Sequence, residues 1–320
     1  MTTRPLHLAW LLLKTARPQQ WLKNLALYAA LLFSGFFFRV PLQEPPYFVT
    51  VTLAFLVFNI LTSAIYFIND IIDREADMLH PFKRKRPIAS GQLPVPIAAY
   101  AAILSLLAVL ILSLAFTPYF QLTVFAYLIL QILYSTVLKH VAIIDVLSIA
   151  GGFLLRVYAG AFVVNLHTNV WFLLTVISAS LFLAVGKRQS ERTLMQGKVL
   201  GETRKSLRQY SQRLLDQYTA MFANATWLTY ALFAFQRDSF TSDDELPNIF
   251  TTLPKTLQSQ KLLMLTVPIV IFGVMRYLQL VYEDNKGESP ERVLLRDLPL
   301  LGAAGLFGVT TMLVIYVINA

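Results

Sequence analysis

The stretch "FVTVTLAFLVFNILTSAIYFINDIIDREAD", residues 48–77, joins a long apolar run to a block of four acidic residues. An apolar run of about 20 residues is long enough to cross the hydrocarbon core of a bilayer as a helix. Carboxylates next to hydrocarbon are costly unless they have a partner or a function. The stretch therefore predicts a membrane-spanning helix and marks its charged end as the place to look for a functional site.

Comparable apolar runs recur along the whole chain of 320 residues, which is 56 % hydrophobic and only 14 % charged, unlike soluble domains. They lie at 21–38, 48–68, 94–116, 119–138, 144–164, 170–186, 214–235, 262–282 and 297–318. Apolar runs of this length predict transmembrane helices. We therefore expect an all-α integral membrane protein in which nine spans form a single membrane domain over residues 1–320.

The basic residues are divided unevenly between the two sides that nine alternating spans would create. Of the 27 lysines and arginines, 22 fall on or next to the side that holds the N-terminal stretch. Cytoplasmic loops carry the excess of lysine and arginine. We therefore expect the N-terminus on the cytoplasmic side of the cell membrane, the C-terminus on the external side, and the site facing the cytoplasm. The net charge of +9 fits this orientation and anionic lipids or substrates better than it fits nucleic acid.

Three aspartates follow the second apolar run at helical spacing. At roughly 100° per residue, Asp70, Asp73 and Asp77 fall within an arc of about 60°. Carboxylates so close together repel one another and need a positive partner. Since the chain has no cysteine and only four histidines, a hard cation such as Mg2+ suits this site best. The alternative is an exposed helix end whose acids pair with Arg74 and the basic residues 83–86.

Side chains that suit phosphate binding accompany these acids. They lie before the first span, beside and after the acids, and around the fourth, fifth and sixth spans: Arg17, Gln20, Lys23, Asn24, Asn69, Lys83, Arg84, Arg86, Tyr134, Lys139, Asp145, Arg156, Lys187, Arg188 and Glu191. Arg156 is so deep in a span that it should face the bundle interior and hold an anion or a carboxylate, with a structural ion pair as the alternative. Carboxylates for Mg2+ that face several cations indicate a diphosphate site.

Several other chemistries lose support. The chain contains no P-loop glycine pattern, no G-x-S-x-G and no H-E-x-x-H, which disfavours nucleotide hydrolysis and serine or zinc hydrolysis. A transporter or lipid-binding protein that uses the acids as an ion site remains an alternative. Against it, the sequence shows no inverted repeat and no pair of spans broken by glycine and proline.

The pattern Asn-Asp-x-x-Asp-x-x-x-Asp at 69–77 resembles the first aspartate-rich motif of the UbiA superfamily of intramembrane prenyltransferases. Where that superfamily has a second aspartate cluster after the sixth span, this chain reads "GKRQSE" at 186–191, which replaces carboxylates by direct positive charge. Together with "RPQQWLKN" at 17–24, the stretch 134–161 and "PERVLLRD" at 290–297, this departure resembles the branch typified by decaprenyl-phosphate phosphoribosyltransferase.

The resemblance implies a nine-helix bundle with a central cavity and cytoplasmic cap loops. It also implies a water-soluble donor, phosphoribosyl pyrophosphate, and a lipid acceptor, polyprenyl phosphate. Catalytic roles would fall to the three aspartates, as Mg2+ ligands, and to Lys187. The other candidates would bind phosphate groups, and Lys83, Arg84 and Arg86 would form a lid. A prenyltransferase that joins a prenyl diphosphate to an aromatic or other small acceptor is the alternative. The sequence leaves a homo-oligomer and the lipid length open.

Overall fold

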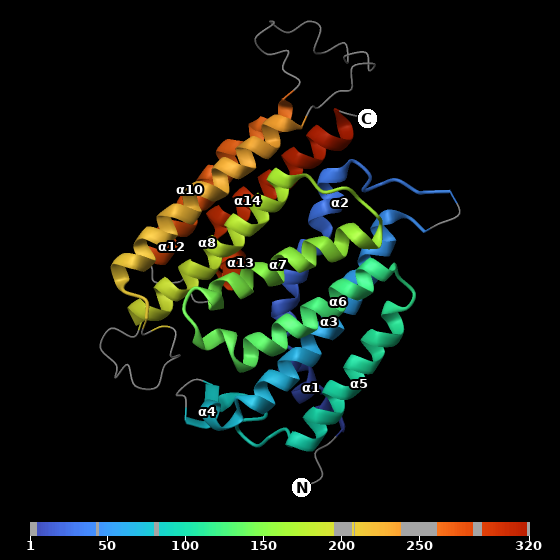
Figure 1. The fold of residues 1–320 in the computed structure, drawn as a ribbon, viewed down its shortest axis with the longest axis vertical. Coiled ribbons are helices and arrows are strands. Elements are labelled where there is room, and N and C mark those ends of the chain that lie inside the picture. The colour runs from blue at the N-terminus through green and yellow to red at the C-terminus, as the bar shows by residue number, and fades with distance from the viewer. Residues whose placement is uncertain are drawn as a thin grey trace, which may run out of the picture. The chain divides into compact units, whose positions relative to one another are not determined.

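The computed structural model describes residues 5–42, 45–79, 83–194, 207, 209–237, 261–283 and 290–318. Every regular element within these ranges is helical, and the described residues contain no strand (Figure 1). The chain forms two compact units: the first contains Met1–Leu31 and Phe36–Leu166, and the second contains Leu32–Gly35 and His167–Ala320. The prediction of a single domain over 1–320 stays a prediction.

Within the described residues, seven helices are long and apolar enough to cross a membrane, so the structure is that of a multi-pass membrane protein. They are Tyr47–Ile72, Val95–Ser113, Pro118–Thr136, Ile144–Val163, Val170–Thr193, Leu262–Tyr282 and Leu298–Val317. Each of them coincides with one of the nine predicted spans. The all-helical membrane class is thus confirmed, whereas the count of nine is not.

The two remaining spans differ from expectation in different ways. Residues 21–38 do not form one continuous helix: η1 (Pro18–Leu27) is a 3-10 helix, and α2 (Tyr28–Ser34) adds only seven α-helical residues. The prediction of a membrane-spanning helix there is not confirmed. In contrast, α10 (Gln212–Gln236) has 25 residues, enough to span a bilayer, but side chains such as Asp216 and Asn224 make it more polar than the seven.

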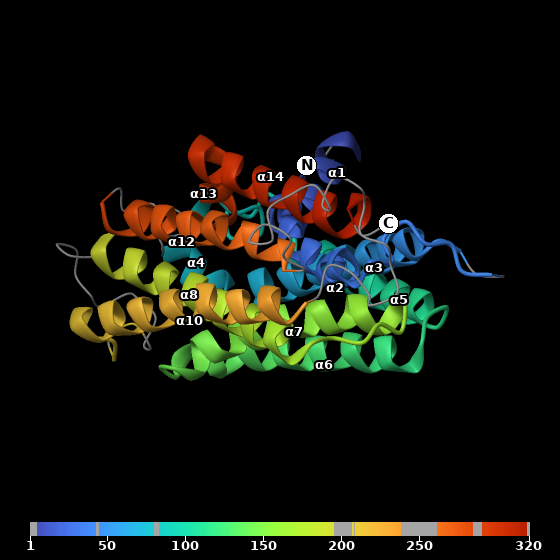
Figure 2. The same cartoon turned by 90° about the horizontal axis from the view of Figure 1, so that it is seen from above.

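The first unit is built around one long helix. Its main helices are α1 (Pro5–Ala16), α3 (Tyr47–Ile72), α5 (Val95–Ser113), α6 (Pro118–Thr136) and α7 (Ile144–Val163). Helix α3 packs along α5, α6 packs along α7, and η1 contacts both α3 and α7 (Figures 1 and 2). Phe58 packs against Phe120 and Tyr127, with ring centroids 6.0 and 5.5 Å away. These aromatic contacts join α3 to α6.

The contact between η1 and α7 depends on a glycine. A Cβ atom at Gly160 would lie 1.8 Å from the carbonyl oxygen of Leu27, far inside van der Waals contact. Because glycine lacks this atom, the backbone of η1 can approach α7 directly. The close approach of η1 to α7 therefore requires a glycine at position 160.

In the second unit, helices that follow one another along the chain pack against each other. Its elements are α8 (Val170–Leu194), α10, η5 (Leu262–Thr266), α12 (Val267–Tyr282), α13 (Pro290–Arg296), α14 (Leu298–Met312) and the π-helix η6 (Leu313–Val317). Helix α10 lies along α8 and also contacts α12 (Figure 2). Arg276 of α12 pairs with Asp297 at 2.6 Å, and the Asp297 carboxylate also accepts from the Leu300 N–H at the start of α14. This pair joins α12 to α14.

Candidate active site

The three predicted aspartates occupy the junction between α3 and a short helix, α4 (Arg74–Leu79). Helix α3 ends at Ile72, and the Asp73 N–H still donates to the Asn69 carbonyl at 2.9 Å. Asp70 and Asp77 are buried, with 2 % and 3 % exposure. Asp73 and Asp77 both lie close enough to Asp70 to interact with it electrostatically. We call Asp70, Asp73 and Asp77 the acid cluster.

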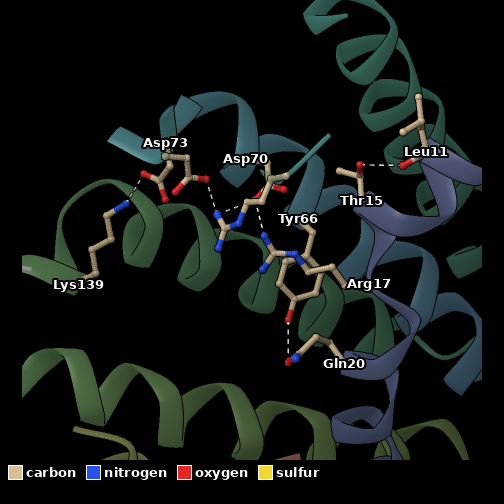
Figure 3. Close-up of polar contacts among 10 residues, drawn as sticks. Leu11, Thr15, Arg17, Gln20, Tyr66, Asp70, Asp73 and Lys139 are labelled. Atoms are coloured by element: carbon tan, nitrogen blue, oxygen red, sulfur yellow. Dashed lines mark hydrogen bonds and ion pairs between the residues drawn. The ribbon is translucent and has the colours of Figure 1, made fainter. Parts of the chain in front are cut away.

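Each carboxylate of the acid cluster has a cationic partner (Figure 3). The contacts are Arg17 Nη2 to Asp70 Oδ1 at 2.5 Å, Arg86 Nη1 to Asp70 Oδ1 at 3.2 Å, Arg86 to Asp77, and Lys139 Nζ to Asp73 Oδ1 at 2.8 Å. We call Arg17, Arg86 and Lys139 the cation set. The sequence alternative, in which the acids pair with basic neighbours, is therefore partly realised through Arg86, but at a buried helix end rather than an exposed one.

Arg17 is held in place by its backbone and by an aromatic ring. It is the residue between α1 and η1 and has φ 55° and ψ 66°, a left-handed conformation that costs a non-glycine residue about 1–2 kcal/mol. Its guanidinium lies 4.8 Å from the centroid of the Tyr66 ring, and the Tyr66 hydroxyl donates to Gln20 at 3.4 Å (Figure 3). Arg17 therefore combines a left-handed backbone conformation with an ion pair to Asp70.

Arg86 follows the short 3-10 helix η2 (Lys83–Lys85). Its N–H donates to the Lys83 carbonyl at 2.9 Å, and its own carbonyl accepts from the Ser90 N–H at 2.8 Å. These bonds fold the segment so that the Arg86 side chain bridges two carboxylates of the acid cluster. Arg84, also predicted to belong to a lid, is exposed, and Lys83 is half-buried.

Lys139 comes from η3 (Leu138–His140), the connection between α6 and α7. Tyr134, half-buried, lies near the end of α6. Asp145 is completely buried, and its carboxylate accepts from the Val146 N–H at 2.9 Å at the start of α7. A carboxylate at a helix N-terminus is stabilised by the free N–H groups there, which gives Asp145 a structural task. Its predicted substrate role stays a prediction.

Asn24 and Arg156 form a second polar network inside the first unit. Arg156 is 7 % exposed; it donates from Nε to Asn24 Oδ1 at 2.8 Å, from Nη1 to the Gly152 carbonyl at 3.1 Å and from Nη2 to the Tyr127 hydroxyl. Asn24 Nδ2 donates to Asn59 Oδ1 at 2.7 Å. Arg156 faces the interior as predicted, but these partners are neutral, and no described carboxylate pairs with it.

The end of α8 carries the predicted motif "GKRQSE" in the second unit. Arg188 is fully buried and pairs with Glu191 at 2.5 Å, and Lys187 is half-buried. Gln189 donates to Asp216 Oδ1 at 2.8 Å, and Tyr282 donates to the same oxygen at 3.0 Å. Asp216 therefore connects α8, α10 and α12.

Sequence reasoning missed Asn59, Tyr127, Tyr66, Asp216 and Tyr282. Asn59 could have been found, because a polar amide in the middle of an apolar span needs a partner. Asp216 offered a similar signal, as a lone acid near the start of an otherwise apolar helix. The predicted candidates Lys23, on η1, and Asn69, on α3, are half-buried.

Comparison with known proteins identifies the family. The family described as the UbiA prenyltransferase family matches residues 26–296. The chain belongs to the UbiA prenyltransferase family. Decaprenyl-phosphate phosphoribosyltransferase of Mycolicibacterium smegmatis is 34 % identical over 295 residues, which is 92 % of this chain and 88 % of that protein. The protein of the same name from Corynebacterium glutamicum is 34 % identical and covers 95 % of this chain and 86 % of its own.

Solved structures of UbiA homologues share the fold. A UbiA homolog from Archaeoglobus fulgidus bound to GPP and Mg2+ has a TM-score of 0.69 and 19 % identity, and the match covers 95 % of this chain and 99 % of that one. The same homolog bound to Cd2+ has a TM-score of 0.63, with 18 % identity and coverage of 95 % and 99 %. The confirmed architecture is thus a UbiA-type helical fold, from a family whose members include proteins that bind divalent cations.

The residues of the acid cluster suit such a cation chemically. Aspartate oxygens are the ligands that Mg2+ prefers, and Mg2+ is commonly held by one or two carboxylates plus substrate phosphate. Among the described residues, no group of three or more histidine, aspartate or glutamate side chains is arranged to hold a metal. The cation set occupies the carboxylates instead. Asp70 and Asp77 nevertheless converge on one point, the Arg86 guanidinium.

Proposed function

We propose that this UbiA-family protein is a membrane phosphoribosyltransferase. It transfers the 5-phosphoribosyl group from phosphoribosyl pyrophosphate to a polyprenyl phosphate and releases pyrophosphate. The observation that carries this proposal is the 34 % identity, over 92 % of the chain, with a protein named for phosphoribosyl transfer to decaprenyl phosphate. In the reaction, the bond from ribose C1 to the pyrophosphate oxygen breaks, and a bond from C1 to an oxygen of the lipid phosphate forms.

The acid cluster and the cation set would bind the diphosphate of the donor. Asp70, Asp73 and Asp77 would hold Mg2+, which neutralises the negative charge that develops on the departing pyrophosphate. Arginine and lysine donate strong, charge-assisted hydrogen bonds to phosphate oxygens. Arg86 and Lys139 already point at the acid cluster, so they need only short side-chain movements to reach a diphosphate bound there.

The acceptor places different demands on the protein. A phosphate monoester is already anionic at neutral pH, so the reaction requires no strong general base. The chain must instead hold the lipid phosphate close to C1 in a productive orientation. Lys187 and Arg188 of the "GKRQSE" motif are the first candidates to test for binding a phosphate group of the donor or the acceptor.

We also propose that the protein lies in the inner, or cell, membrane and that the acid cluster lies on its cytoplasmic side. Phosphoribosyl pyrophosphate is a water-soluble, highly charged donor and would reach the site from that compartment, while the acceptor lipid would enter from the bilayer. The excess of basic residues, 22 of 27, lies on or next to the same side as the acid cluster when the predicted spans alternate.

Donor specificity tests the proposed function directly. Purified protein is incubated with Mg2+, radiolabelled phosphoribosyl pyrophosphate and decaprenyl phosphate, and label is measured in the lipid phase. We expect label to enter the lipid and pyrophosphate to be released in equal amount. If no label reaches the lipid, but the protein consumes a prenyl diphosphate in the presence of an aromatic acceptor, the chain is a prenyltransferase instead.

A further inference from the structure

The acid cluster is electrically balanced before any ligand arrives. Its three carboxylates face the three members of the cation set, so the formal charges of these six side chains cancel. Asp70 and Asp77 are also buried, where removing one partner of an ion pair leaves an uncompensated charge at a high free-energy cost. A free divalent cation would therefore meet six side chains with no net formal charge, whose carboxylates are already bonded.

Arg86 is the member of the cation set that must move before the buried carboxylates can bind a metal. It bonds both Asp70 and Asp77, so any ion that uses these two aspartates takes over its acceptors. Arg17 shares Asp70 Oδ1 with Arg86, but its described ion pair is with Asp70 alone, and the Tyr66 ring and its own left-handed backbone also hold it. The Arg86 side chain makes its described polar contacts with the two carboxylates and with no aromatic ring.

We infer that Arg86 makes binding of the divalent cation conditional on the diphosphate. When the two arrive together, the phosphate oxygens give Arg86 new charged acceptors in exchange for the carboxylates it loses. When the cation arrives alone, Arg86 is displaced with no new acceptor, and the six-residue site gains two positive charges. Arg86 thus selects a cation that is accompanied by diphosphate over the free cation. This inference rests on the proposed function only in taking a diphosphate as the ligand.

Binding measurements without any turnover test this role. The purified full-length protein in detergent is dialysed to equilibrium against labelled Mn2+, as a stand-in for Mg2+, with and without inorganic pyrophosphate. For the wild type we expect pyrophosphate to strengthen Mn2+ binding by at least about tenfold, and Mn2+ to strengthen pyrophosphate binding by the same factor. In Arg86→Gln, Mn2+ alone should bind at least about tenfold more tightly than in the wild type, with a smaller effect of pyrophosphate.

Lys85→Gln is the matched control. Lys85 is the neighbouring residue and is exposed, so this variant removes the same charge from the same segment without touching the acid cluster. It should bind Mn2+ like the wild type. Arg86→Lys keeps the charge but loses the planar fork that reaches two carboxylates, and should fall between the wild type and Arg86→Gln.

Two results would overturn the inference: equal Mn2+ binding by the wild type with and without pyrophosphate, or identical binding of Mn2+ alone by the wild type and Arg86→Gln. The first comparison uses the wild type only, so it stands even if a variant fails to fold. The assay contains neither sugar nor lipid acceptor. A chain that shows this coupling but transfers no phosphoribosyl group contradicts the proposed function and leaves the role of Arg86 intact.

Discussion

At the scale of single residues, a substitution of Asp73 should distinguish an effect on activity from an effect on stability better than a substitution of Asp70 or Asp77. Its side chain is 28 % exposed, compared with 2 % for Asp70. We expect Asp73→Ala to reduce phosphoribosyl transfer by roughly a thousandfold, comparable to the loss of a strong electrostatic contact in an active site. The unfolding temperature should change by only a few degrees, as for other partly exposed sites. A variant with full transfer activity would remove Asp73 from the proposed metal ligands.

Asn24 raises a different question at the same scale, because sequence reasoning assigned it to phosphate and the structure gives its amide three bonds inside the first unit. Asn24→Ala leaves a buried Arg156 donor without an acceptor and should destabilise the protein by about 2–3 kcal/mol. Tyr28→Phe, which removes a single hydrogen bond to Thr52 at 2.9 Å, is the control and should cost about 1 kcal/mol. Thermal unfolding in detergent measures both. Unchanged stability of Asn24→Ala with loss of transfer would instead support phosphate binding.

At the scale of elements, the interrupted first span shows what hydropathy can and cannot predict. The apolar run at 21–38 was recognised, because transfer free energies depend on side chains. The 3-10 geometry of η1 was not, because it depends on contacts with distant residues: Asn24 with Arg156, and Leu27 with Gly160. Seven other spans were predicted correctly because a regular α-helix satisfies its own backbone hydrogen bonds in lipid.

The contact between η1 and α7 yields a prediction at this scale. Gly160→Ala places a Cβ atom 1.8 Å from the Leu27 carbonyl oxygen, so η1 must shift, and we expect a loss of about 3 kcal/mol or more, at the upper end for overpacking. Gly151→Ala in the same helix is the control, since its Cβ would meet Leu130 at an ordinary 3.4 Å. The unfolding temperatures of the two variants decide the matter. If they are equal, the close approach of η1 is not required for stability.

At the scale of the whole molecule, the predicted orientation can be tested without removing any natural thiol, since the chain contains no cysteine. Ser90 lies between α3 and α5, His167 lies between α7 and α8, and both are exposed. We expect a membrane-impermeant maleimide to label His167→Cys in intact cells. Ser90→Cys should react only after the cells are permeabilised. The opposite labelling pattern would invert the orientation and the proposed cytoplasmic location of the acid cluster.

The site as a whole was predictable in its composition but not in its pairings. Helical spacing predicted that the three aspartates of the acid cluster lie close together. Positive charge was the reason for choosing Arg17, Arg86 and Lys139 as candidates. Which cation meets which acid was not predictable, because Arg17 and Asp70 are 53 residues apart and Lys139 and Asp73 are 66 apart. Such pairs depend on how the helices pack, and the spacing of residues in a single sequence does not predict that packing.

The contact of Arg86 with two aspartates has a consequence for how these positions vary among homologues. One guanidinium serves both Asp70 and Asp77, and Arg17 also serves Asp70. A substitution at 77 or 86 alone therefore leaves a charge unbalanced in this pair, whereas a change of both residues does not. Across a family tree, we expect the residues at 77 and 86 to be kept or replaced together, so a lineage that has lost the acid at 77 should also have lost the arginine at 86.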